Sequence, residues 1–185
     1  DSLKTDNESY GIPARETSMD GVLIGKGNTY IEKAYQAAVG KSLARAESAA
    51  ALQEGGDLIR IYDAGTAGTE TQEAGQSDQG QKEFLPSKSM VFAGSQNASG
   101  TVEGVLLTMT ACDLTSGMSS FAVGVNETKV YQVPEWGTGF LWAGEECAGY
   151  YGEHDGVKTV VLGFDLRESD FPLKAEFPIF MSNAI

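Results

Sequence analysis

The stretch VKTVVLGFDLRESDFPLKAEFPIFMSNAI, residues 157–185, is the most informative part of this sequence. It begins with β-branched residues around Thr159, a composition typical of a buried strand. A turn at Gly163 follows, then a polar segment closed by Pro172, and the apolar residues around Pro178 predict a helix. The segment is therefore predicted to be a strand followed by a helix, which is the repeating unit of an α/β fold.

Earlier in the chain, short apolar runs alternate with helical patterns. Residues 21–25 predict a buried strand, Thr29 and Glu32 stand at the spacing of a capping box, and Gly40 predicts the end of that helix. A second helix is predicted over 47–54, and further strands over 42–44, 58–62, 89–93, 104–109, 121–125, 129–133 and 140–143. The early alternation predicts a parallel sheet wound with helices, and the closer spacing of the later strands predicts antiparallel strands at its edge.

The chain of 185 residues is long enough for one domain with a sizeable core. Residues 1–20 are polar and weakly patterned, so they predict a segment that leads into the domain, which then occupies 21–185. Residues 64–82 contain no large apolar side chain and predict a flexible loop.

The charge balance argues against some classes of partner. Thirteen basic and twenty-six acidic residues give a net charge of −13, which would repel nucleic acid and an anionic membrane surface. No apolar run approaches the ~20 residues needed to cross a bilayer. The chain begins without Met and a helical pattern still runs at Ile185, so we expect a piece of a longer protein that meets the membrane only through segments outside this chain.

Several motifs, in order along the chain, resemble one bacterial family. They are LKTDNESY (3–10), VLIGKGNTYIEKA (22–34), LIRIYDAG (58–65), FLPSKSMVFAG (84–94) and GFDLRESDFPLKAEFPI (163–179). The set resembles the class I glutamine amidotransferase-like domain of bacterial membrane proteins that also carry a von Willebrand factor A domain. The resemblance covers about residues 20–185, and the long loop at 64–82 departs from it.

This resemblance implies a flavodoxin-like three-layer sandwich, with a mostly parallel sheet and antiparallel edge strands. It also implies a domain on the extracytoplasmic face of the cytoplasmic membrane, with a von Willebrand factor A domain upstream and a membrane helix downstream.

The sequence contains no recognisable catalytic triad of a class I amidotransferase. Such an enzyme needs a nucleophilic Cys on a sharp turn with a His and a carboxylate beside it. Neither Cys112 nor Cys147 has the flanking glycines of that turn, and the single His, His154, lies in a predicted hairpin turn. Two cysteines without CxxC spacing also predict no zinc site, although they could form one disulfide. We expect no catalytic residue, metal or cofactor.

The best candidate for a ligand site is the glycine-rich turn Gly25-Lys26-Gly27-Asn28, because backbone N–H groups at a helix start attract anions. Ligands of wound sheets bind at the carboxyl ends of the strands. That rule groups this turn with the other turns that follow strands, at Asp63, Gly65, Gly94, Ser95 and Asp165. The alternative is that these residues only close turns and cap helices.

The sequence therefore predicts a non-catalytic module, a spacer or protein-interaction domain with an unidentified protein partner. The alternatives are a cysteine-dependent amidase using Cys112 or Cys147, or a small-ligand or calcium-binding domain. Calcium could bind the acidic turns, which contain Glu153, Asp155, Asp165, Glu168 and Asp170. The aromatic residues Tyr131, Trp136, Phe140 and Trp142 form either an exposed partner surface or core packing under a hairpin.

Overall fold

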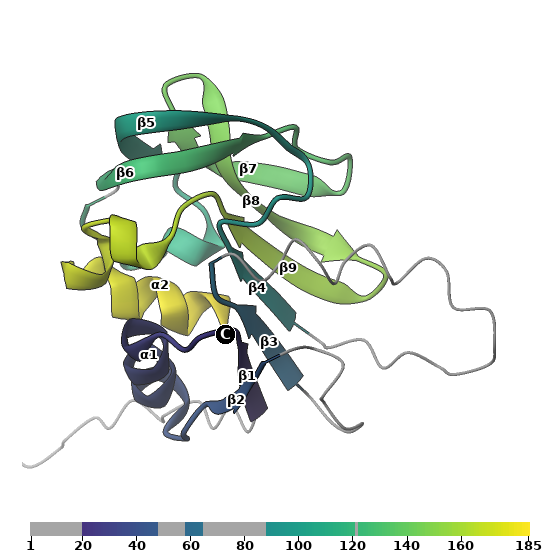
Figure 1. Ribbon diagram of the computed structural model, residues 1–185, viewed down its shortest axis with the longest axis vertical. Helices are drawn as coiled ribbons and strands as arrows, with labels where there is room; N and C mark the ends of the chain where they lie inside the picture. The colour runs from purple at the N-terminus through teal and green to yellow at the C-terminus, as the bar shows by residue number, and fades with distance from the viewer. Residues whose placement is uncertain (1–19, 48–57, 65–87, 121) are drawn as a thin grey trace, which may run out of the picture.

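The computed structural model describes residues 20–47, 58–64, 88–120 and 122–185. Figure 1 shows a lower part, in which parallel strands lie beside two helices, and an upper part made of long antiparallel strands. The predicted lead-in segment lies outside the described residues except for Asp20, and so do Gly65, nearly all of the 64–82 loop and all but the first residue of the 47–54 helix.

The parallel half contains five strands in the order β2-β1-β3-β4-β9. They are β1 (Asp20–Ile24), β2 (Ala44–Ala46), β3 (Leu58–Tyr62), β4 (Lys88–Phe92) and β9 (Val157–Leu162). The chain passes from β1 to β2 on one side and returns to place β3 on the other side. The direction of winding therefore switches between β1 and β3, as in flavodoxin-like sheets, which confirms the predicted α/β fold class.

The antiparallel half continues the same sheet in the order β9-β8-β7-β5-β6. Its strands are β5 (Ala98–Met109), β6 (Ala122–Tyr131), β7 (Gly137–Ala143) and β8 (Glu146–His154). Antiparallel edge strands are confirmed, but the details of the prediction are corrected. The two strands predicted over 121–125 and 129–133 are replaced by the single strand β6, which runs without a break from Ala122 to Tyr131, and β8 was not predicted.

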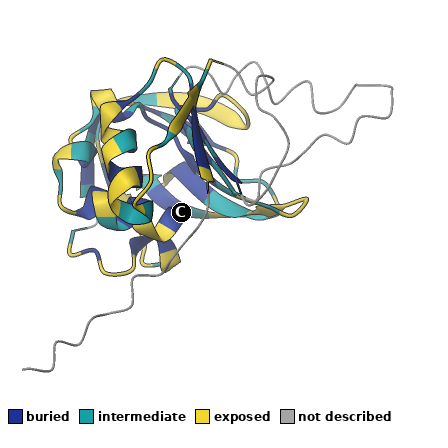
Figure 2. Ribbon diagram, turned by 90° about the horizontal axis from the view of Figure 1, so that it is seen from below, coloured by how far each residue is buried: buried dark blue, intermediate teal, exposed yellow. Residues whose placement is uncertain are grey.

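Two α-helices, α1 (Thr29–Val39) and α2 (Glu176–Ala184), pack on one face of the parallel strands. The described residues also form three short 3-10 turns: η2 (Asp113–Thr115), η3 (Leu166–Glu168) and η4 (Phe171–Leu173). Figure 2 shows buried residues along the strands and exposed residues on the outer surfaces of the helices. The described helices thus supply one of the two helical layers of the predicted three-layer sandwich.

The core follows from the alternation of side chains along each strand. Every second residue of the parallel strands faces the helices, and these residues share a cluster with the inner faces of α1 and α2. The cluster includes Leu23, Ile61, Met90 and Val160 from the strands and Tyr35, Phe177 and Phe180 from the helices. The opposite face carries a smaller apolar cluster of Val22, Ile24, Leu58 and Tyr62.

The start of α1 differs from the predicted capping box. Asn28, rather than Thr29, is the N-cap, because its side-chain oxygen accepts hydrogen bonds from the backbone N–H groups of Tyr30 and Ile31. Asn is among the preferred N-cap residues. The helix ends as predicted at Gly40, which has a left-handed φ of 76°.

Candidate functional site

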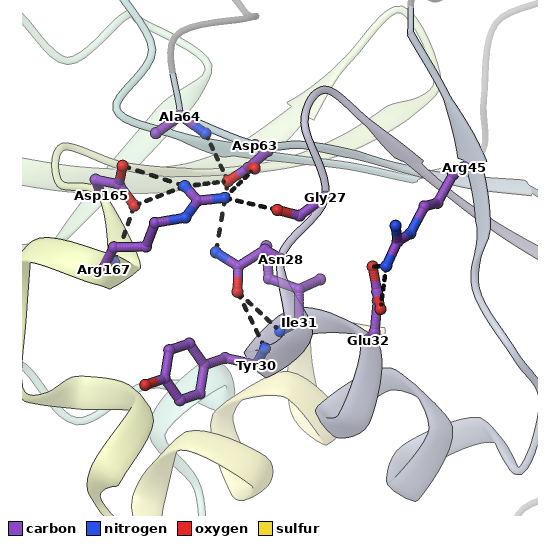
Figure 3. A network of polar contacts seen from close by, with 10 residues as sticks. All are labelled: Gly27, Asn28, Tyr30, Ile31, Glu32, Arg45, Asp63, Ala64, Asp165 and Arg167. Atoms are coloured by element: carbon purple, nitrogen blue, oxygen red, sulfur yellow. Dashed lines mark hydrogen bonds and ion pairs between the residues drawn. The ribbon is translucent and has the colours of Figure 1, made fainter.

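The turns that follow β1, β3 and β9 meet at the edge of the sheet formed by the carboxyl ends of the parallel strands (Figure 3). Gly27 and Asn28 come from the turn between β1 and α1, Asp63 directly follows β3, and Asp165 precedes η3. The structure therefore brings together four of the residues that the sequence grouped at this edge. It also adds Arg167, a residue of η3 that the sequence pattern did not single out.

Arg167 connects these turns through its guanidinium group. Its Nη2 atom lies 2.5 Å from Asp63 Oδ2 and 2.7 Å from the carbonyl oxygen of Gly27. Its Nη1 atom lies 3.1 Å from Asp63 Oδ1 and 3.2 Å from Asp165 Oδ1. Two parallel N–H···O bonds between Arg and a carboxylate form a strong and directional pair. The hydrogen bond with Asp63 raises the pKa of Arg167 above its ordinary value.

Asp63 is the buried centre of this network. Its side chain is 2% exposed, whereas that of Arg167 is 40% exposed. In addition to Arg167, the carboxylate accepts a bond of 2.9 Å from the backbone N–H of Ala64 and one of 3.5 Å from Asn28 Nδ2. A buried carboxylate is costly unless it is paired and hydrogen-bonded, and here it is both.

At the predicted anion site, side chains of the chain itself form hydrogen bonds with several of the backbone groups around the start of α1. Asn28 uses its oxygen on two of the backbone N–H groups at the helix start, and its amide nitrogen faces Asp63. Arg167 donates a hydrogen bond to the carbonyl oxygen of Gly27. The four residues Gly27, Asn28, Asp63 and Asp165 thus bind Arg167 or one another at this edge.

Gly25 and Lys26 lie apart from this network. They line an open groove of about 450 Å³ together with Arg45, Ala46 and Glu47, between the ends of β1 and β2. Arg45 forms an ion pair with Glu32, 2.6 Å from Nη2 to Oε1, and this partner raises the pKa of Arg45. Gly25 donates its N–H to the carbonyl of Ala46 at 3.0 Å.

The turn after β4 forms a second polar cluster. Ala93 has a φ of 52°, and among the described residues it is the only non-glycine residue with a left-handed φ directly after a parallel strand. Lys129 Nζ donates to the carbonyl of Ala93 at 2.7 Å and to Ser95 Oγ at 2.8 Å. Tyr131 donates its hydroxyl to the carbonyl of Gly94 at 2.9 Å. Ser95 and Gly94 are therefore held by β6 rather than by the Arg167 network.

The two cysteines are free thiols and not a disulfide. Cys147 is buried on β8 and donates to the carbonyl of Gly149 at 3.1 Å, and burial raises the pKa of its thiol. His154 lies at the other end of β8, so the rise of an extended strand separates the two residues by roughly 23 Å. The imidazole of His154 stacks on Trp136, with ring centres 5.4 Å apart.

Cys112 lies in the turn before η2. The Thr115 hydroxyl lies 3.8 Å from its sulfur and accepts the Cys112 backbone N–H at 2.9 Å. The single His of the chain, His154, stacks its imidazole on Trp136.

Most of the acidic side chains considered for calcium form hydrogen bonds or ion pairs with other residues of the chain. Asp170 accepts the N–H of Gly124 at 2.9 Å and pairs with Lys174 at 3.3 Å. Glu168 accepts from Asn126 Nδ2 at 2.7 Å. Over residues 20–47, 58–64 and 88–185 apart from 121, no group of three or more His, Cys, Asp or Glu side chains is placed to hold a metal ion.

The aromatic residues singled out in the sequence divide between two faces of the sheet. Phe140 is buried against Phe180 of α2 in the main core. Tyr131 belongs to a separate cluster on the other face, where Trp136 and Trp142 are partly buried against it. Core packing therefore accounts for Phe140 and Tyr131, while the two tryptophans remain partly exposed.

Comparison with known proteins supports the fold. No known family and no curated protein sequence matches the chain. Among solved structures, it is similar to the cytoplasmic protein STM3548 of Salmonella typhimurium, with a TM-score of 0.59, 12% identity and coverage of 89% of this chain and 96% of that one. It is also similar to a Thermoplasma acidophilum protein described as a proposed GMP synthase component, with a TM-score of 0.51, 10% identity and coverage of 90% and 94%.

At these identities the similarity concerns the fold alone. It is consistent with the class I glutamine amidotransferase-like fold that the resemblance implied, but neither structure supports a link to von Willebrand factor A proteins. In the described part of the chain, no helix has the length and apolar character required to cross a membrane.

Proposed function

We propose that this domain is a non-catalytic module, which acts as a spacer or as a protein-interaction domain within a larger protein. One observation carries the proposal. The edge of the sheet between β1 and β3, where ligands bind in flavodoxin-like folds, is occupied by the chain's own Arg167 in a pair with buried Asp63.

The environment of the thiols supports the same proposal. A nucleophilic Cys needs a lowered pKa and an adjacent base. Burial instead raises the pKa of Cys147, and the imidazole of His154 stacks on Trp136 at the far end of the same strand. The turn after β4 has the strained backbone that presents a nucleophile in strand-to-helix turns, but it carries the methyl group of Ala93 and leads into β5.

The extracytoplasmic location belongs to this proposal and rests on the resemblance of the sequence motifs alone. One of the two similar structures is described as a cytoplasmic protein. Sequence from the same gene on either side of this chain tests the location, because the proposal requires a von Willebrand factor A domain before it and an apolar span after it.

A second candidate function is favoured by one contact. Lys129 Nζ lies 2.8 Å from Ser95 Oγ, and serine–lysine pairs act as nucleophile and base in some hydrolases. In this structure Lys129 also donates to the carbonyl of Ala93, which suits an ammonium that ties the turn to β6. We therefore rank a serine hydrolase below the non-catalytic module.

Thiol labelling tests the proposed function against the cysteine-dependent amidase. The folded protein is treated with iodoacetamide at about pH 6, and the rate at each cysteine is compared with that of the urea-unfolded chain. We expect Cys147 to react more slowly in the folded protein, because burial raises the pKa of its thiol and shields it. Faster labelling of either cysteine in the folded protein would support the amidase.

The serine hydrolase is tested with a fluorophosphonate probe, with S95A as the matched control. We expect no adduct by intact-protein mass spectrometry. An adduct that forms on the wild type and is lost in S95A and K129M would replace the module with the hydrolase.

A further inference from the structure

We propose that Gly27, Asp63 and Asp165, which surround the guanidinium group of Arg167 after β1, β3 and β9, form a guanidinium-binding site that the chain fills with its own side chain. These three acceptor residues are called the crevice below. The inference goes beyond the proposed function because it assigns a ligand class to the crevice. An outside ligand of that class, such as an arginine side chain, could enter only when Arg167 leaves.

The acceptors in the crevice match the donors of a guanidinium group. Nη2 carries two N–H groups, which donate to Asp63 Oδ2 and to the Gly27 carbonyl oxygen. Nη1 also carries two N–H groups, which donate to Asp63 Oδ1 and to the carboxylate of Asp165. All four terminal N–H bonds thus have an acceptor within 3.2 Å.

This arrangement selects the shape of the cation as well as its charge. A guanidinium is planar and presents its N–H bonds as a rigid fork, whereas an ammonium is a compact charge with three rotatable donors. An ammonium cannot bridge both oxygens of Asp63 and reach Gly27 and Asp165 at the same time. Lys or a simple amine should therefore fill the crevice poorly.

The acceptors are held independently of the Arg167 side chain. Gly27 lies in the turn that Asn28 fixes to α1, and Asp63 accepts the N–H of Ala64. Asp165 accepts the backbone N–H of Arg167 at 2.9 Å, a bond that any residue other than proline at position 167 can donate. Removal of the side chain should thus leave the acceptors in place around an empty space.

Departure of Arg167 breaks a strong pair, but two features permit it. It lies on η3, a 3-10 turn of only three residues, and its side chain is 40% exposed. The buried carboxylate of Asp63 then loses the cation that bridges both of its oxygens, and a buried carboxylate that loses a cationic partner favours a replacement cation.

The test is rescue of R167A by methylguanidinium. We expect R167A to melt below the wild type, and millimolar methylguanidinium to raise its Tm in a saturable manner by about 2 to 4 °C. Methylammonium at the same concentration should have no such effect. The wild type should gain nothing from methylguanidinium, since its crevice is already filled.

Two further variants make the outcome decisive. R167A/D63N lacks the central carboxylate, so methylguanidinium should not stabilise it. R167Q keeps most of the side-chain length without the charge, and it replaces R167A if that variant does not fold without the ligand. The proposal is overturned if methylguanidinium stabilises neither single variant more than methylammonium does, or if it stabilises the wild type or R167A/D63N equally.

Discussion

At the scale of single residues, Asn28 links the end of the sheet to helix α1. Its oxygen accepts from Tyr30 N at 3.1 Å and Ile31 N at 3.4 Å, and its nitrogen lies 3.5 Å from Asp63 Oδ1. The side chain is 3% exposed, so water cannot replace these bonds easily. The cap is the stronger of the two roles, because the contact with Asp63 is at the limit of a hydrogen bond.

Replacement of Asn28 should therefore destabilise the domain through the helix cap. We expect N28A to lower the free energy of unfolding by about 1 to 2 kcal/mol. N28S keeps a capping oxygen but loses the contact with Asp63, and it should cost less than half as much. Urea unfolding followed by circular dichroism measures both, and equal losses in the two variants would show that the cap is not the main role of Asn28.

At this scale the sequence predicted the residues that follow strands but not their long-range partners. Asn28, Asp63 and Asp165 could be grouped because each lies in a turn that follows a predicted parallel strand. Arg167 and Lys129 were missed because their contacts depend on long side chains that reach segments far away in the sequence. The available signal was weak: Arg167 is a single cation within the acidic turn DLRESD.

At the scale of secondary structure, Gly163 connects three strands. It directly follows β9, donates its N–H to Ala148 of β8 at 2.8 Å and accepts the N–H of Lys129 of β6 at 2.8 Å. Asp170 continues this contact, because it donates its N–H to the carbonyl of Gly124 at 3.0 Å. The antiparallel strands therefore curl until β6, the outer strand of the sheet, is bonded to the segment that follows β9. Such cover protects an edge strand from pairing with another chain.

A side chain at position 163 should break this contact. A Cβ atom there would meet the backbone oxygens of Lys129 and of Ala148, the latter at 2.8 Å, and neither atom can move without shifting a strand. We expect G163A to lower the free energy of unfolding by about 3 kcal/mol. The measurement is again urea denaturation.

G100A is the matched control for this substitution. Gly100 also lies in the antiparallel part, but a Cβ atom there would approach only Val130 Cγ2, at an ordinary 3.4 Å. We expect G100A to change stability by less than about 1 kcal/mol. Equal effects of G163A and G100A would contradict the tight junction at Gly163.

The elements that the sequence predicted correctly are those with strong local patterns. The parallel strands β1, β3 and β9 are short runs rich in Ile, Leu and Val, and α1 has apolar residues at Ile31, Ala34 and Tyr35. β8 was missed because its sequence ECAGYYGEH contains two glycines, which are rare inside strands. The first half of β5 is exposed, so it lacks the apolar alternation that marks a half-buried strand.

At the scale of the whole molecule, the switch point of the parallel strands and the closed polar network coincide. The flavodoxin-like order could be anticipated from alternating strands and helices, but the filling of the crevice could not. It depends on η3 bringing Arg167 across to Gly27 and Asp63, which lie 140 and 104 residues earlier in the chain. The central interaction of this edge is therefore the pair of Arg167 and Asp63.

A double-mutant cycle measures that pair directly, with R167A, D63N and the double variant studied by urea denaturation. R167A alone should cost about 2 to 4 kcal/mol, a range that allows for the partial exposure of the Arg167 side chain, because it leaves a buried carboxylate without its cation. The double variant should recover part of this loss, which gives a coupling energy of about 1 to 3 kcal/mol.

The exposed pair of Lys41 and Asp20, 2.9 Å apart, is the control, and a cycle with K41A and D20N should give less than about 1 kcal/mol. A closed crevice predicts a coupling energy for Arg167 and Asp63 well above that of the control. A coupling energy no larger than that of the control would contradict this, because the pair of Arg167 and Asp63 would then not hold the crevice closed.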